Sequence, residues 1–156
     1  MVSEKVGQTA ITTGAALRLQ VRGAKLIELP EVLDLRGGLT FGELEQGLPF
    51  NPKRYFLVYG VPDPEVRGEH AHRQLEQLLV CVHGACSVII DDGHYREEVG
   101  LSRPTIALHI SAMVWGVQYR FTPDAVLLVL ASEKYDPEDY IRKYDEFLRL
   151  VKGSDQ

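Results

Sequence analysis

The sequence predicts an all-β protein, a sandwich or barrel, with a single α-helix at its C-terminus. Most of the chain consists of short runs rich in β-branched and aromatic residues, separated by Gly, Pro and Asp-Gly turn signals. Only the last part of the chain has apolar residues at three- and four-residue spacing. The 156 residues, 45% of them hydrophobic, suffice for one domain with its own core.

The expected strands follow one another in a meander-like order. Asp92-Gly93 is the strongest turn signal between them, because a tight hairpin turn needs positive φ and Gly adopts it at little cost. Residues 78–82 and 126–130 are apolar on both faces of a strand, so a second sheet or a second subunit should cover the face that is not in the core. The expected strands are residues 24–29, 39–45, 54–61, 75–82, 85–91, 94–99, 105–110, 114–121 and 125–132.

The helix is expected to begin at Asp136. This residue can cap a helix, Pro137 suits the first helical position, and Asp139 adds negative charge where the helix dipole favours it. The apolar face that follows indicates core or interface. Its members are Tyr140, Ile141, Tyr144, Phe147, Leu148 and Val151.

Residues 1–24 show no clear period and are expected to form an N-terminal arm or an added strand, ahead of a single domain at 25–152. The net charge of -5 argues against a nucleic-acid binder and favours a small molecule as partner. No basic region followed by an apolar stretch opens the chain, and no run approaches the roughly 18 apolar residues of a membrane span. We therefore expect a cytoplasmic protein without membrane contact, in which Cys81 and Cys86 are buried thiols and not a disulfide.

His70 and His72 stand two residues apart, just before a strongly β-forming run. Residues i and i+2 of a strand point to the same face, so the two imidazoles should project side by side. Burying both for packing alone would require two sets of hydrogen-bond partners. The pair therefore indicates a functional site.

One interpretation of the pair is a metal site. His70, His72 and Glu76 match the first three ligands of a cupin barrel in type and spacing, and they would suit iron, manganese, nickel or zinc. The fourth ligand should follow Trp115, where this chain has Gly116. Three ligands can still form an open site, so a metal-dependent cupin enzyme stays an alternative.

Six stretches of the chain resemble the cupin-fold nucleotide-sugar 3,4-ketoisomerases. The resemblance implies a cupin jelly-roll barrel with a C-terminal helix, which shifts the keto group of dTDP-4-keto-6-deoxyglucose from C4 to C3 without cofactor or metal. It also implies a homodimer that exchanges N-terminal strands. The matching stretches are residues 49–50, 53–54, 67–72, 75–81, 91–93 and 129–145.

The keto shift requires a proton to leave C3, an enediol, and a proton to return at C4, and a neutral imidazole suits this work. We expect His70 to be the base and His72 its proton partner, with the order between them open. The diphosphate calls for guanidinium groups. The candidate substrate-binding residues are Arg36, Arg54, Arg67, Tyr55, Tyr59, Glu76, Trp115 and Tyr119.

The chain departs from the family pattern at two places. Phe56 and Leu57 stand where a tyrosine pair is expected, and Gly116 stands where a histidine is expected. A ketoisomerase of altered product, an epimerase-like relative and a nucleotide-sugar binder without catalysis are therefore the alternatives.

Overall fold

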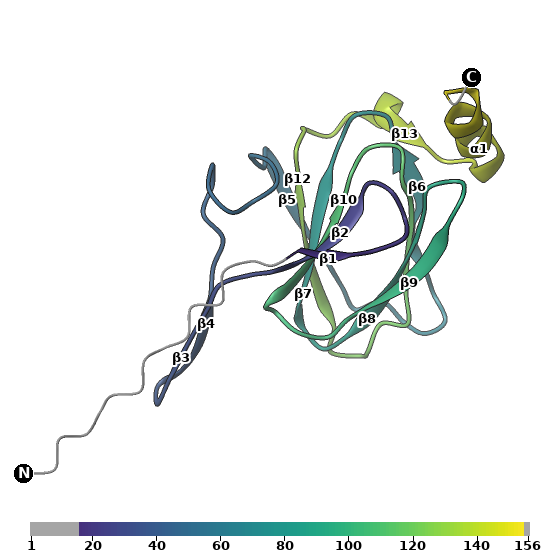
Figure 1. The fold of residues 1–156 in the computed structure, drawn as a ribbon. Coiled ribbons are helices and arrows are strands. Elements are labelled where there is room, and N and C mark those ends of the chain that lie inside the picture. Colours follow the sequence, from purple (N-terminus) through teal and green to yellow (C-terminus); the bar gives the residue numbers. More distant parts are fainter. Residues whose placement is uncertain (1–15, 155–156) are drawn as a thin grey trace, which may run out of the picture.

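The computed structural model describes residues 16–154 and shows a cupin-type jelly roll with a C-terminal helix (Figure 1). Two antiparallel sheets face one another, one of six strands and one of five. The first has the order β1 (Ala16–Arg18), β2 (Ala24–Glu28), β10 (Ile106–Ile110), β7 (Gln77–His83), β12 (Val126–Ala131) and β5 (Arg54–Tyr59). The second has the order β13 (Tyr140–Ile141), β6 (Arg67–His72), β11 (Trp115–Tyr119), β8 (Cys86–Asp91) and β9 (Arg96–Leu101).

The expected meander order is wrong. The strand β7, for example, pairs with β10 and β12, both distant in sequence, while β6 pairs with β11. Sequence periodicity reports which residues form strands, whereas pairing depends on which apolar faces meet in three dimensions. The hairpin of β8 and β9 does form at Asp92-Gly93, with a φ of 91° at Gly93.

The core lies between the two sheets. It is built from inward-facing residues of both, such as Leu79 of β7, Val88 of β8 and Leu127 of β12. Cys81 and Cys86 are both buried and free in this core, as expected.

The helix α1 (Tyr144–Gly153) begins later than predicted. Asp136 instead caps the short 3-10 helix η1 (Pro137–Asp139), and the next two residues form β13 along the end of β6. The cause is tertiary, because the Asp139 carboxylate accepts the backbone amides of Gln74 and Leu75 and ties this segment to the turn after β6. A continuous helix from Asp136 would give up these bonds.

The hairpin of β3 (Glu31–Asp34) and β4 (Gly37–Thr40) projects from the two main sheets (Figure 1). The predicted strand at 39–45 is therefore mostly wrong, since residues 41–52 form an irregular segment with two isolated bridges. Leu48 and Phe50 of this segment pack on the outer face of the six-stranded sheet. Among the described residues, no helix is long and apolar enough to cross a membrane.

Candidate active site

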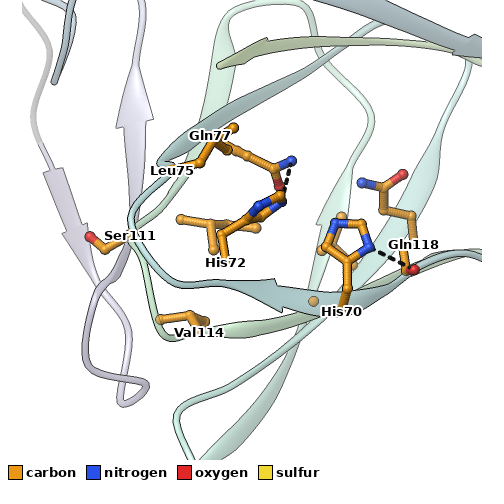
Figure 2. A pocket seen from close by; sticks show the side chains of 11 residues that line it. His70, His72, Leu75, Gln77, Ser111, Val114 and Gln118 are labelled. Atoms are coloured by element: carbon orange, nitrogen blue, oxygen red, sulfur yellow. Dashed lines mark hydrogen bonds between the residues drawn. The ribbon is translucent and has the colours of Figure 1, made fainter. Parts of the chain in front are cut away.

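His70 and His72 lie side by side on β6 and point into the space between the sheets (Figure 2). This confirms the expectation that they share one face. The pocket around them is mostly apolar, and three other polar side chains, from β7, from the turn after β10 and from β11, also line it. These are Gln77, Ser111 and Gln118.

A carbonyl group of the same strand fixes the proton of neutral His70. Its Nδ1 lies 2.8 Å from the carbonyl oxygen of Gly68. A carbonyl only accepts, so Nδ1 carries the hydrogen and Nε2 keeps a free lone pair. Burial lowers the pKa of His70 below its ordinary value, and the charge of Arg142 acts in the same direction, against the opposing effect of the Gly68 bond.

The carboxylate of Asp139 fixes the proton of neutral His72 in the same way. Its Nδ1 lies 3.0 Å from Oδ2 of Asp139, and its Nε2 lies 3.5 Å from Nε2 of Gln77. Burial, and then the neighbouring His70, lowers the pKa of His72 to about 4, although Asp139 raises it. Both imidazoles are therefore neutral at neutral pH, which is the state a general base requires.

An aromatic cluster borders the two histidines. The ring of Tyr140 lies 4.9 Å from that of His70 and 4.5 Å from that of His72, centroid to centroid. The ring centroids of Tyr140 and Tyr135 are 5.8 Å apart, and Cζ of Arg54 lies 5.4 Å from the centroid of the Tyr135 ring.

Arg54 is the predicted arginine that the structure brings toward the histidines. Its positive charge is among the causes that lower the pKa of His72. Its Nε is buried and has no hydrogen-bond partner among the described residues. An unpaired buried donor is costly, so this nitrogen is suited to meet an anionic ligand.

The other predicted arginines and the tyrosines of β5 lie elsewhere. Arg36 is exposed in the turn of the β3–β4 hairpin and pairs with Asp34 at 2.6 Å. Arg67 and Tyr59 line a separate surface pocket. Tyr55 and Tyr59 are 69% and 71% exposed, because the alternation along β5 turns Arg54, Phe56 and Val58 inward and the tyrosines outward.

Glu76, Trp115 and Tyr119 do not reach the histidine pocket either. Glu76 lies on the other face of its sheet, with Oε2 3.4 Å from Nε2 of His109. Trp115 packs beneath α1 against Tyr144, at 5.4 Å between ring centroids, and Tyr119 stacks with Arg120.

In each case the adjacent residue lines the pocket instead: Gln77, Gly116 and Gln118. A shift of one residue moves a side chain to the opposite face of a strand. With Glu76 turned away, the metal interpretation loses its third ligand, and the described residues contain no group of three His, Cys, Asp or Glu side chains placed to hold a metal.

Sequence reasoning missed Gln77, Gln118, Asp139 and Tyr140. The strand period could have revealed the two glutamines, because each is adjacent to a residue that was singled out: Gln77 follows Glu76, and Gln118 precedes Tyr119. Asp139 and Tyr140 carried no such signal, since only the pairing of β13 with β6 brings them to the histidines.

The jelly roll and its inward-facing pair of neutral imidazoles define a cupin-type protein equipped for proton transfer. A family model described as "FdtA: WxcM-like, C-terminal" matches residues 22–152. The chain belongs to this family. It is 41% identical over 127 residues to the TDP-4-oxo-6-deoxy-alpha-D-glucose-3,4-oxoisomerase of Aneurinibacillus thermoaerophilus, covering 81% of this chain and 91% of that relative.

Solved structures of similar proteins agree. A 3,4-ketoisomerase from Helicobacter canadensis is 39% identical, with a TM-score of 0.79 over 83% of this chain and 97% of that one. The 3,4-ketoisomerase QdtA of Thermoanaerobacterium thermosaccharolyticum, as a histidine-to-asparagine mutant in complex with TDP-4-keto-6-deoxyglucose, is 34% identical, with a TM-score of 0.83 over 85% of this chain and 96% of that one.

Proposed function

We propose that this protein is a 3,4-ketoisomerase that converts dTDP-4-keto-6-deoxyglucose into the 3-keto sugar. The observation that carries the proposal is the histidine pair, in which both Nδ1 atoms face a protein acceptor, so that both Nε2 atoms keep an unprotonated lone pair; that of His72 lies 3.5 Å from the amide nitrogen of Gln77. The names of the similar proteins support the substrate and the reaction.

The reaction moves two protons and needs no redox partner. Nε2 of His70 takes the proton from C3, the electron pair of that bond forms the C3–C4 double bond, and the C4 carbonyl oxygen becomes that of an enediolate. His72 relays the hydroxyl proton from the oxygen on C3 to the oxygen on C4. Return of a proton to C4 then leaves a ketone at C3.

The diphosphate of the substrate requires cations near the histidines. We assign this role first to Arg54, because its buried Nε lacks a partner and its charge acts on His72. Arg36 and Arg67 stay predictions, since their side chains lie away from the pocket of the same subunit.

We also propose a cytoplasmic homodimer. Large apolar side chains of the outer face of the six-stranded sheet remain exposed, among them Leu57 at 47% and Val82 at 40%, and so do Leu33 and Leu39 of the projecting hairpin at 60% and 58%. Exposed apolar surface of this kind marks interfaces. An exchange of N-terminal strands between subunits would cover such surface and stays a prediction.

The decisive experiment incubates the protein with freshly made dTDP-4-keto-6-deoxyglucose in deuterated water and follows the sugar by NMR. A ketoisomerase incorporates deuterium at C3 and produces a new ketone signal. Binding of the nucleotide sugar without exchange would support the non-catalytic alternative, which Phe56 and Gly116 favour by lacking a hydroxyl and an imidazole group; Leu57 lies on the outer face of its sheet.

A further inference from the structure

Asp139 is bound on both of its carboxylate oxygens. Oδ1 accepts the amide of Gln74 at 2.8 Å, while Oδ2 accepts the amide of Leu75 at 3.3 Å and faces Nδ1 of His72 at 3.0 Å. The side chains of His72 and Asp139 are only 5% and 13% exposed. The contact is therefore shielded from water, which makes it stronger than a surface pair.

The backbone around Asp139 is held as firmly as its side chain. The carbonyl oxygen of Asp139 accepts the amide of Arg73 at 2.9 Å, and the next residue, Tyr140, pairs with His72 across β13 and β6. The Tyr140 ring in turn rests against the imidazole of His72. The carboxylate thus has one position relative to His72, fixed from both sides.

We propose that Asp139 is a positioning residue, which holds the Nδ1–H of His72 so that the unprotonated Nε2 faces the substrate. The inference rests on the proposed function, since it concerns the proton relay of the same site. A carboxylate only accepts hydrogen bonds, so it selects the tautomer with the hydrogen on Nδ1. The amide of Gln77, 3.5 Å from Nε2, lies on the pocket side and suits a nitrogen that accepts.

The carboxylate has a second effect during the reaction. When His72 takes the hydroxyl proton, its imidazolium forms in a buried site where an isolated charge is unfavourable. The negative charge of Asp139 lies against that cation and offsets part of the cost. An asparagine at this position would supply neither the charge nor a fixed tautomer, because its NH₂ group can turn toward Nδ1.

The tautomer can be measured directly. Long-range proton–nitrogen-15 correlation spectra distinguish protonated from unprotonated ring nitrogens, and the chain has 5 histidines, few enough to resolve. Loss of one set of signals in a His72→Asn variant assigns His72. At neutral pH we expect the wild-type protein to show the hydrogen of His72 on Nδ1. A hydrogen on Nε2 would overturn the inference even if the Asp139→Asn variant does not fold.

The variant Asp139→Asn tests the consequence for turnover. We expect it to lower kcat about 10²-fold, the lower end of what acid–base catalysis contributes, with KM changed less than about 2-fold, and to give His72 signals of the Nε2–H form. The matched control is Asp136→Asn, which alters a carboxylate of the same segment that accepts the amide of Glu138 and lies away from His72. It should leave kcat and the His72 signals unchanged.

The outcomes separate this inference from the proposed function. Wild-type kcat in a folded Asp139→Asn variant would overturn the positioning role while leaving the isomerase in place. An Nδ1–H tautomer that Asp139→Asn shifts, in a protein that never exchanges deuterium into the sugar, would uphold the positioning role and reject the isomerase.

Discussion

The imidazole rings of His70 and His72 meet edge to face, with centroids 4.8 Å apart and planes at 84°. Nδ1 of His70 faces the carbonyl oxygen of Gly68, and Nδ1 of His72 faces the carboxylate of Asp139. The two rings therefore differ mainly in the acceptor at Nδ1. Two such groups cannot both be charged without repulsion, and His70 indeed helps to lower the pKa of His72. A positive charge on one ring therefore disfavours a charge on the other.

The variant His70→Asn should abolish deuterium exchange at C3, with a fall of about 10²-fold or more, because the base is lost while the volume is nearly kept. Nucleotide-sugar binding and thermal unfolding should change little. The comparison is made by NMR and calorimetry. The exposed His83, which pairs with Asp124 at 3.4 Å, provides the control His83→Asn. Wild-type turnover of the His70 variant would show that the base lies elsewhere.

Folding stability should fall as the pH is lowered through the acidic range. The pKa of His72 is about 4 in the folded protein, because burial and then the charges of His70 and Arg54 lower it more than Asp139 raises it. In an unfolded chain it is about 6.5. Between these values the unfolded state binds a proton that the folded state does not. The free energy of unfolding should therefore decrease, by about 3 kcal/mol over the full range.

Urea unfolding at several pH values measures this effect. The variant His72→Gln should retain a smaller dependence on pH, to which His70 and His109 still contribute because burial lowers the pKa of each. An unchanged dependence in that variant would mean that His72 is not the titrating group.

The purified protein should keep its activity in a chelator and carry no stoichiometric transition metal. Glu76 faces His109 on the other side of the sheet, and Gly116 stands where the fourth cupin ligand would be. Elemental analysis and a chelation assay check this. One metal per chain, with activity that is lost on its removal and regained on its return, would instead establish the metal-dependent alternative.

Much of the strand content could be predicted, because alternation and turn residues are local properties. That His70 and His72 share one face of a strand could be predicted for the same reason, because it follows from local alternation. The contact of His72 with Asp139 does not, since the two residues are 67 positions apart and meet only because β13 pairs with β6.

The errors among the substrate-binding candidates have a different origin. Glu76 lies in a matching stretch, Trp115 and Tyr119 lie on an expected strand, and each of the three precedes or follows a pocket residue by one position. A motif locates the stretch of chain, but the face is set by strand pairing and by local irregularities, such as the bulge between Gly116 and Val117.

Sedimentation at micromolar concentration should show a dimer and not the 17.5 kDa chain alone. The aromatic face of the helix is satisfied within one subunit, since Phe147 is fully buried, so the interface is expected on the outer face of the six-stranded sheet. Leu57→Glu should weaken the dimer, and Tyr95→Glu, at an exposed site in the β8–β9 turn, should not. A wild-type monomer would rule out the proposal.

The variant Gly116→His should change the rate or the C4 configuration of the product. Gly116 lines the pocket directly opposite His70 in the pairing of β11 with β6. A Cβ atom there would meet only Ile110 Cδ1 at 3.9 Å and the Ile89 carbonyl at 4.0 Å, which are ordinary contacts. The strand therefore has room for a side chain at this position, and an imidazole would stand beside the base.

The reason to expect an effect lies in the proton that returns to C4. The hydroxyl groups of Tyr55, Tyr59 and Tyr119 could donate a proton, but these side chains do not line the pocket. We therefore expect the donor to be a water held by His72, which would be the least stereoselective donor. An added imidazole would compete with that water from a fixed direction. Gly116→Ala is the matched control, because it fills the same space without a proton donor.

Binding and product must be measured together, since a larger side chain also narrows the space for the sugar. Lower affinity in both variants would indicate steric exclusion. Retained affinity, with a new rate or product in Gly116→His alone, would show that position 116 faces the reacting carbons. Unchanged affinity, rate and product in both variants would place it outside the reacting site, and the return of the proton would then have to be sought on the wall formed by Gln77 and Gln118.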